Sequence, residues 1–436
     1  MPYPYQHRLK PTGECFLSSM PDELLLRILK YFAPAEYFHF ESEYEPCLPI
    51  PLVCRRWERL YYSILYRNID LGLSGWTKPS RINRLQATLR HRLDLSDAVR
   101  TVRIRFWQPS DATCEIIAHI LTCCNGLRKF CLDTYFNNST WVILNAAKRA
   151  PLATLELGYG GGPSLQMILK HFSLPTLKEL SINDYGSGNG EEPGLYPSSD
   201  NAHEDLSLLL SSASPCNVTT MELIEPSAPA HVTKSFLQWP ARLKSLTMSL
   251  FGAKYTVDAV QGILDDHCHT LQHISLHTLA RGLECLPDFS SFTSLESLQI
   301  HGDNLFAESP CRAAARLDAP RLRHLRISFE RQDQRETSCK AFASDKIGWL
   351  EDFVSHKTPT TNRLETVFVK FSPLVFISDL NWMDYGIWPW SYIDQAVGLF
   401  ADHNVAMTYT QPRYSRKEWD QAVEREKNKM KKGRPA

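Results

Sequence analysis

The sequence repeats a short apolar pattern ten times, and this repeat restricts the possible folds more than any other feature. Successive copies start 24 to 28 residues apart, except for two gaps of 41 and 42 residues. A period of this size predicts a stacked array, because one unit alone cannot bury its apolar face. The pattern is L-x-x-L-x-L with aliphatic substitutes, and its copies start at Val99, Leu127, Leu152, Leu177, Val218, Leu243, Leu271, Leu295, Leu322 and Leu364.

Each copy predicts a short strand whose alternate apolar side chains face the core, followed by a return element that covers them. Several return elements have the apolar spacing and the start signals of helices, such as Ser110 and Asp111 before the first one. The sequence therefore predicts an α/β solenoid with parallel strands and outer helices. The helical segments are 112–124, 140–150, 163–172, 205–213, 232–239, 256–267 and 344–354.

Two long insertions and an aromatic cluster interrupt this regular pattern. The segments 183–204 and 328–346 are polar and predict surface loops, which are either binding elements or neutral insertions. The array is expected to close with a helix over 394–404 and a strand over 405–410. Trp382, Trp388 and Trp390 lie just before this end. We interpret them as a cap on the last repeat, with an aromatic patch for a partner as the alternative.

Residues 20–71 do not follow the repeat and predict a small helical module. Pro21, Asp22 and Glu23 favour a helix start, and an apolar stripe follows them. After an acidic linker, a second run with helical apolar spacing begins near Leu52. These two runs predict two helices that lie outside the strand array.

The module resembles an F-box. The resemblance is carried by Met-Pro-x-Glu-Leu-Leu-Leu-x-Ile-Leu from Met20 to Leu29, and by Leu-Val-Cys-Arg-Arg-Trp from Leu52 to Trp57. Together with the repeats, the whole chain looks like an F-box protein of the leucine-rich-repeat kind. The expected fold is thus an N-terminal helical F-box module followed by an irregular leucine-rich-repeat solenoid.

The resemblance implies a function without chemistry on this chain. Such a protein is the substrate receptor of a Skp-cullin-F-box ubiquitin ligase: its F-box binds the Skp adaptor, and through it the cullin and RING subunits, while its repeats hold a protein substrate. A repeat scaffold with a degenerate F-box and no role in ubiquitylation is the alternative, and the two runs could also be a helical cap of the solenoid. Carried over by position, the adaptor contacts are Met20, Pro21, Leu24, Leu25, Ile28, Leu52, Val53 and Trp57.

The positions between the apolar residues of each repeat are expected to form columns on the concave face of the solenoid. These columns begin with the basic pair Arg103 and Arg105 and pass through acidic and small residues. We interpret a later cluster as a polar patch suited to an acidic or phosphorylated substrate. A solvated strand face without a ligand is the alternative. The cluster consists of His273, His277, His301, His324 and Arg326.

No catalytic or cofactor motif accompanies the repeats. The sequence lacks GxSxG, HExxH, a phosphate-binding GxxxxGK and a dinucleotide GxGxxG, so we expect neither an enzyme nor a cofactor. His267, Cys268 and His269 are a minor candidate for a metal site, but residues adjacent in sequence do not converge as zinc ligands do, and we expect no metal.

Composition excludes several partners and compartments. Lys plus Arg and Asp plus Glu both total 48, which does not favour nucleic acid or an anionic membrane. Neither a secretory signal nor an 18-residue apolar stretch is present, so we expect an intracellular protein, cytoplasmic or nuclear. The predicted organisation is an extension at 1–18, the F-box-like module at 19–71, the solenoid at 72–410 and a basic tail at 411–436. The tail predicts a solvated helix or a nuclear-entry signal.

Overall fold

The structure is a computed structural model of the 436-residue chain. The chain divides into two compact units, Met1–Leu152 and Ala153–Ala436, and each is described by itself. The residues described are 20–32, 55–72, 79–106, 110–134, 139–158, 168, 175–183, 216–224, 228–250, 255–277, 286–329, 342, 344–356, 364–371, 388, 390–412 and 415–433.

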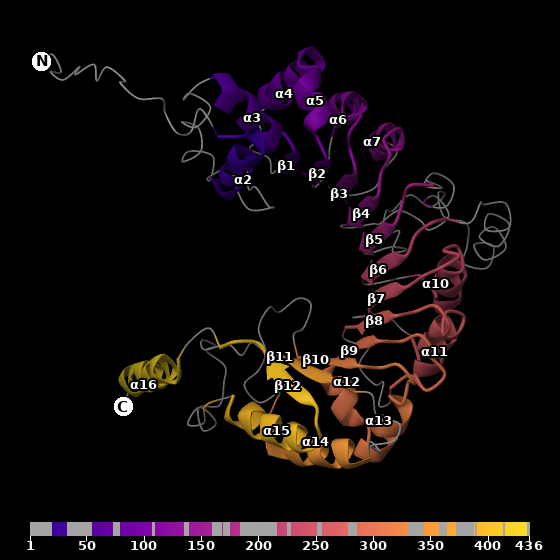
Figure 1. Cartoon of the computed structure of the whole chain (residues 1–436), viewed down its shortest axis with the longest axis vertical. Helices are drawn as coiled ribbons and strands as arrows, with labels where there is room; N and C mark the ends of the chain where they lie inside the picture. Colours follow the sequence, from indigo (N-terminus) through magenta and orange to yellow (C-terminus); the bar gives the residue numbers. More distant parts are fainter. Residues whose placement is uncertain are drawn as a thin grey trace, which may run out of the picture. The chain divides into compact units, whose positions relative to one another are not determined.

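The first unit starts with helices and continues into a parallel strand ladder. Strand β1 pairs with β2, and β2 pairs with β3, all in parallel. Helices α4 to α7 lie on one side of these strands (Figure 1). In chain order the elements are α2 (Asp22–Phe32), α3 (Arg55–Leu65), β1 (Asn68–Gly72), α4 (Pro79–His91), α5 (Leu93–Ala98), β2 (Thr101–Phe106), α6 (Asp111–Cys123), β3 (Lys129–Thr134) and α7 (Thr140–Ala147).

The second unit is a longer ladder of the same kind. Strands β4 to β12 follow one another in sequence order, each parallel to the next. Figure 1 shows helices α10, α11 and α13 to α15 on the outer side of these strands.

The bounds of the elements in the second unit follow the repeat. The strands are β4 (Thr154–Gly158), β5 (Glu179–Asn183), β6 (Thr220–Ile224), β7 (Ser245–Ser249), β8 (His273–Leu276), β9 (Ser297–His301), β10 (His324–Ser328), β11 (Thr366–Lys370) and β12 (Ala406–Tyr409). The helices are α10 (Ala230–Leu237), α11 (Val257–Asp265), α12 (Gly302–Ala307), α13 (Pro310–Arg316), α14 (Ser344–His356), α15 (Ser391–Asp402) and α16 (Arg416–Gly433).

The core is a stack of mostly aliphatic side chains, two from nearly every strand. Leu298 and Ile300 of β9 lie in register with Leu325 and Ile327 of β10, and all four are buried. Burying one such side chain stabilises the fold by about 1.5–3 kcal/mol. This alternation is the L-x-x-L-x-L repeat in three dimensions, so the α/β solenoid predicted from the sequence is confirmed.

Most predicted return helices within the described residues are also present. Ser110 caps α6, and its Oγ accepts a hydrogen bond from the backbone N–H of Thr113. The predicted segments around 140–150, 232–239, 256–267 and 344–354 correspond to α7, α10, α11 and α14. The predicted helix at 205–213 lies outside the described residues, as does that at 163–172 apart from the buried Ile168.

One strand lies where the sequence predicted only the helical module. Residues Asn68–Gly72 form β1, in which Ile69 and Leu71 are buried and pair in register with Val102 and Ile104. Its six-residue copy, from Tyr66 to Leu71, begins with tyrosine instead of an aliphatic residue and so does not match the L-x-x-L-x-L pattern.

The C-terminal end of the array is closed by aromatic side chains. Trp390 is buried and contacts Phe371, Trp388 and Trp419 at ring centroid distances of 5.9, 4.6 and 5.9 Å. Trp419 belongs to α16, in the basic tail, and is only 1% exposed. The tail is therefore helical and anchored by one tryptophan. Trp382 lies outside the described residues. Among the helices of the described part, none has the length and apolarity that crossing a membrane requires.

Candidate functional site

Helices α2 and α3 pack through a small apolar core. Leu25 and Leu29 of α2 are buried against Leu60 and Tyr61 of α3. Leu25 and Leu29 are four residues apart and therefore lie on one face of the helix. The remaining apolar contacts come from partly buried side chains, namely Met20, Leu26, Trp57, Ile64 and Leu65.

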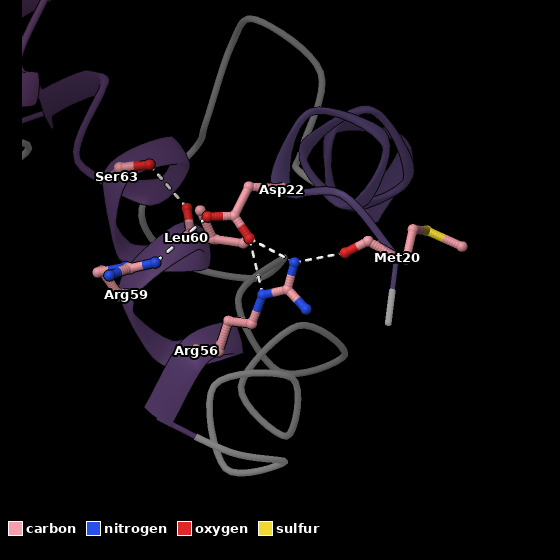
Figure 2. Close-up of polar contacts among 6 residues, drawn as sticks. All are labelled: Met20, Asp22, Arg56, Arg59, Leu60 and Ser63. Atoms are coloured by element: carbon pink, nitrogen blue, oxygen red, sulfur yellow. Dashed lines mark hydrogen bonds and ion pairs between the residues drawn. The ribbon is translucent and has the colours of Figure 1, made fainter. Parts of the chain in front are cut away.

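A polar clamp fixes the start of α2 to α3, as Figure 2 shows. Arg56 Nε donates to Asp22 Oδ1 at 2.7 Å, and Arg59 Nη2 donates to Asp22 Oδ2 at 3.2 Å. Arg56 also donates to the backbone oxygen of Met20. Asp22 lies in the first turn of α2, where the helix dipole favours a negative charge. The clamp therefore holds the ends of both predicted F-box blocks together.

A second apolar stripe of α2 faces away from this core. Pro21 and Leu24 are exposed, the latter by 47%, and Ile28 is half-buried. Their spacing of three and four residues places them on one face of the helix. We call Pro21, Leu24 and Ile28 the outer stripe.

The expected adaptor contacts divide between this outer stripe and the core. Leu25 is 0% exposed, so its side chain belongs to the core and is not available at the surface, which corrects the expectation from the resemblance. Met20 and Trp57 are partly buried and pack against the same core. Leu52 and Val53 lie outside the described residues.

The two basic candidate residues of the first unit, Arg103 and Arg105, lie near acidic side chains. Arg105 Nη2 on β2 donates to Asp70 Oδ2 on the neighbouring strand β1 at 2.8 Å. Asp133, paired in register with Arg105, has a raised pKa because burial disfavours its charge, although Arg105 and Arg103 act in the opposite direction. Arg103 and Arg105 thus lie among carboxylates rather than in a purely basic patch. The sequence analysis missed Asp70 because β1 was not recognised as a strand.

In the second unit the side chains that alternate with the core form two rows across the strands. We call the row at the start of each strand the outer row, and the row two residues further along each strand the middle row. The outer row is Thr154, Glu179, Thr220, Ser245, His273, Ser297, His324, Thr366 and Ala406. The middle row is Glu156, Ser181, Glu222, Thr247, Ser275, Gln299, Arg326, Phe368 and Thr408.

Three residues of the expected polar patch are exposed in these rows. His273, His324 and Arg326 lie on β8 and β10, with Ser297 and Gln299 of β9 between them. His324 Nδ1 is 2.8 Å from Thr366 Oγ1. The Arg326 guanidinium lies 4.8 Å from the centre of the Phe368 ring, which is a cation–π distance. Phe368 was not selected from the sequence, although it occupies an intervening position of the last L-x-x-L-x-L copy.

The other two histidines of the patch differ in position. His301 is 2% exposed, and its Nδ1 accepts the N–H of Asp303 at the start of α12. The expectation that His301 lies on the open face is corrected, because the strand ends there and its side chain caps the next helix. His277 is half-buried just beyond β8, with its Nε2 3.4 Å from Ser275 Oγ.

Within the part of the chain that the structure describes, groups suited to metal binding are not brought together. Among the described residues no group of three or more His, Cys, Asp or Glu side chains could hold a metal ion. His267 is buried, Cys268 is half-buried and His269 is exposed, so the three side chains diverge. Burial raises the pKa of Cys124 to about 12, and it raises those of Cys114 and Cys216 to about 11, which keeps these thiols protonated.

One comparison with known proteins bears on the N-terminal helices of the chain. Residues 17–72 match the F-box-like family model. No curated protein matches the chain.

Two solved structures show a distant similarity to this chain. A leucine-rich repeat-containing protein, LegL7 from Legionella pneumophila, is 11% identical, with a TM-score of 0.40, over 85% of this chain and 99% of that one. Endo-glycoceramidase II from Rhodococcus sp. is 9% identical, with a TM-score of 0.17, over 79% of this chain and 72% of that one. The match over residues 17–72, together with the L-x-x-L-x-L copies that form a ladder of parallel strands, shows that the chain combines an F-box-like segment with a leucine-rich-repeat-like array.

Proposed function

We propose that this chain is the substrate-recognition subunit of a Skp-cullin-F-box ubiquitin ligase, working in the cytoplasm or nucleus. The F-box-like segment and the repeat array together support a protein-interaction module. In the finer proposal, α2 and α3 bind the Skp adaptor, which links the chain to the cullin and RING subunits. The array binds a protein substrate, and this chain carries out no chemistry itself.

The observation that carries the adaptor proposal is the outer stripe of α2. Leu24 is 47% exposed beside the face of α2 that forms the core, and a contiguous exposed apolar stripe is the kind of surface that a partner covers. Pro21 and Ile28 extend the same stripe, and the clamp through Asp22 holds it in place. The partner surface implied is an apolar groove.

Co-purification with the Skp adaptor tests this proposal, and the structure supplies a suitable variant. Leu24→Asp places a charge on the outer stripe in the first turn of α2, where an acidic residue suits the helix dipole. Leu93→Asp is the matched control, because Leu93 is also an exposed leucine, at 69%, in the first turn of α5. A substitution at Leu25 would test folding rather than docking, since Leu25 is in the core.

We expect the unaltered chain and Leu93→Asp to retain the adaptor, and Leu24→Asp to lose at least about tenfold in affinity. Adaptor binding by Leu24→Asp equal to that of the unaltered chain would rule out the docking surface. An unaltered chain that does not bind the adaptor would favour the alternative, a repeat scaffold with a degenerate F-box. The array residues that stay in the proposal as substrate contacts are Arg103, Arg105, His273, His277, His324 and Arg326.

A further inference from the structure

The middle row of the second unit is ordered by charge. Glu156 and Glu222 lie at its β4 and β6 positions, and Arg326 lies at its β10 position. Between Glu222 and Arg326 the row holds only neutral polar residues, namely Thr247, Ser275 and Gln299. The outer row has the same order, with Glu179 on β5 and histidines on β8 and β10. Neither row, as described over β8–β12, includes an acidic residue.

The acidic end is held in place by neighbouring hydroxyl groups. Ser181 Oγ donates to Glu222 Oε2 at 2.9 Å, and Thr154 Oγ1 donates to Glu179 Oε2 at 2.9 Å. Glu179 is exposed and Glu222 half-buried. These carboxylates keep acceptor capacity for a ligand, since each carboxylate accepts several hydrogen bonds.

The cationic end is also preorganised. The Phe368 ring supports the Arg326 guanidinium at 4.8 Å, and this orients its planar donors without neutralising its charge. No ion pair to Arg326 occurs within the described part of the chain. A guanidinium of this kind binds carboxylate or phosphate groups by paired hydrogen bonds. His324 lies two residues before Arg326 on the same face of β10 and adds a second polar group.

The distance between the two ends determines the length of ligand that fits. Four strand intervals separate Glu222 from Arg326, which corresponds to about 19 Å at the usual strand spacing. An extended peptide spans this distance with about six residues. The neutral polar residues between the ends offer hydrogen-bond groups to the backbone of such a peptide.

We propose that this face recognises an extended protein segment that carries a basic group at one end and an acidic or phosphorylated group about six residues away. The basic group lies on Glu222 and Glu179, and the acidic group lies on Arg326 and His324. This inference rests on the proposed function in one respect, because it assigns the substrate-binding role to the array. It goes further by naming the charge order that the substrate must have.

Fluorescence anisotropy with the full-length chain and synthetic peptides tests the inference. The first probe carries two arginines, five glycine or serine residues and two phosphoserines. It is made in both chain directions, because the rows set no direction. The second probe has the same composition with the charges interleaved. We expect the better of the two separated peptides to bind at least about tenfold more tightly than the interleaved peptide.

Two variants assign the binding to the row. Arg326→Gln and Glu222→Gln should each weaken the separated peptide by about tenfold, and Arg321→Ala is the control, since Arg321 is exposed in the turn before β10. An unphosphorylated peptide should bind more weakly and be insensitive to Arg326→Gln. Melting curves of each variant check that the fold is retained.

The inference is overturned if neither separated peptide binds, if both arrangements bind equally, or if Arg326→Gln leaves the affinity unchanged. These outcomes do not depend on the adaptor. A chain that co-purifies with the adaptor but ignores charge order would keep the proposed function and lose only this inference.

Discussion

The F-box-like helices and the strand array bury their apolar side chains in different ways. In the array nearly every strand contributes two buried, mostly aliphatic side chains that stack on those of its neighbours. Among its described side chains, the helical pair α2–α3 has a core of four buried residues, Leu25, Leu29, Leu60 and Tyr61, and keeps a second apolar stripe outside. A small core is marginal by itself, whereas stacked repeats add their burial. The array buries its apolar side chains among its own strands, whereas under the proposed function the outer stripe of the helical pair would be covered by the adaptor.

The largest effect is expected from a cavity in the array. Leu298→Ala removes a fully buried side chain of β9 that contacts the stacks of β8 and β10, and should lower the free energy of unfolding by about 2–5 kcal/mol. Chemical denaturation measures this loss. Adaptor binding by the variant should be unchanged while it is folded, and a parallel loss of adaptor binding would contradict the separate roles of the two regions.

A glycine in the array gives the next largest effect. A Cβ on Gly302 would overlap the ring of buried Phe329, whereas a Cβ on Gly262 of α11 would meet nothing within 4 Å. Gly302→Ala should therefore cost about 1–3 kcal/mol by overpacking. Gly262→Ala should stabilise by about 0.5–1 kcal/mol, because alanine favours a helix interior. Thermal melts of the two variants should move in opposite directions, and shifts of the same sign would refute the packing described around α12.

The clamp of the helical pair should contribute less. Arg56→Gln removes the ion pair with Asp22, and since both side chains are partly exposed the loss should be about 1 kcal/mol. The matched control is Arg92→Gln, which removes the exposed Arg92–Asp94 pair and should have almost no effect. Proteolysis rates of α2 and α3 report the loss locally. Equal rates in both variants would show that the clamp does not hold the outer stripe.

The smallest effect is a pH dependence in the array. Burial lowers the pKa of His267, and Asp266 and the Leu237 backbone offset this only in part. The unfolded chain therefore takes up a proton first as the pH falls below about 6.5, and stability is lost in that direction. His267→Gln should remove part of this loss between pH 7 and pH 5, with the exposed His403→Gln as the control. If the free energy of unfolding depended on pH identically in the unaltered chain and both variants, its assignment to His267 would be contradicted.

The sequence predicts those parts of the fold that depend on local periodicity. The L-x-x-L-x-L copies predict strands because alternate burial is a property of each strand, and the capping Ser110 predicts the start of α6. It does not predict β1, because the copy from Tyr66 to Leu71 begins with tyrosine instead of an aliphatic residue and directly follows the helical run of α3. The helix from Gly302 to Ala307 was likewise missed, since six residues carry little periodicity.

The candidate surfaces were only partly predictable for the same reason. Leu24 and Leu25 are adjacent and chemically identical, and only the packing of α2 on α3 shows which of them is exposed. His301 and Arg326 both occupy intervening strand positions, but the strand ends at His301 and turns its side chain inward. The charge order of the middle row depends on the register between strands, which the sequence pattern gives only by analogy between repeats.

Hydrogen–deuterium exchange of the full chain with and without the Skp adaptor tests the central claim most directly. The account predicts that the adaptor slows exchange in α2 and α3, and that strands β4 to β12 exchange at unchanged rates. In the Leu24→Asp variant the protection of α2 and α3 should disappear. Protection that falls on the strand array, or no protection anywhere, would contradict the assignment of the F-box-like helices as the adaptor surface.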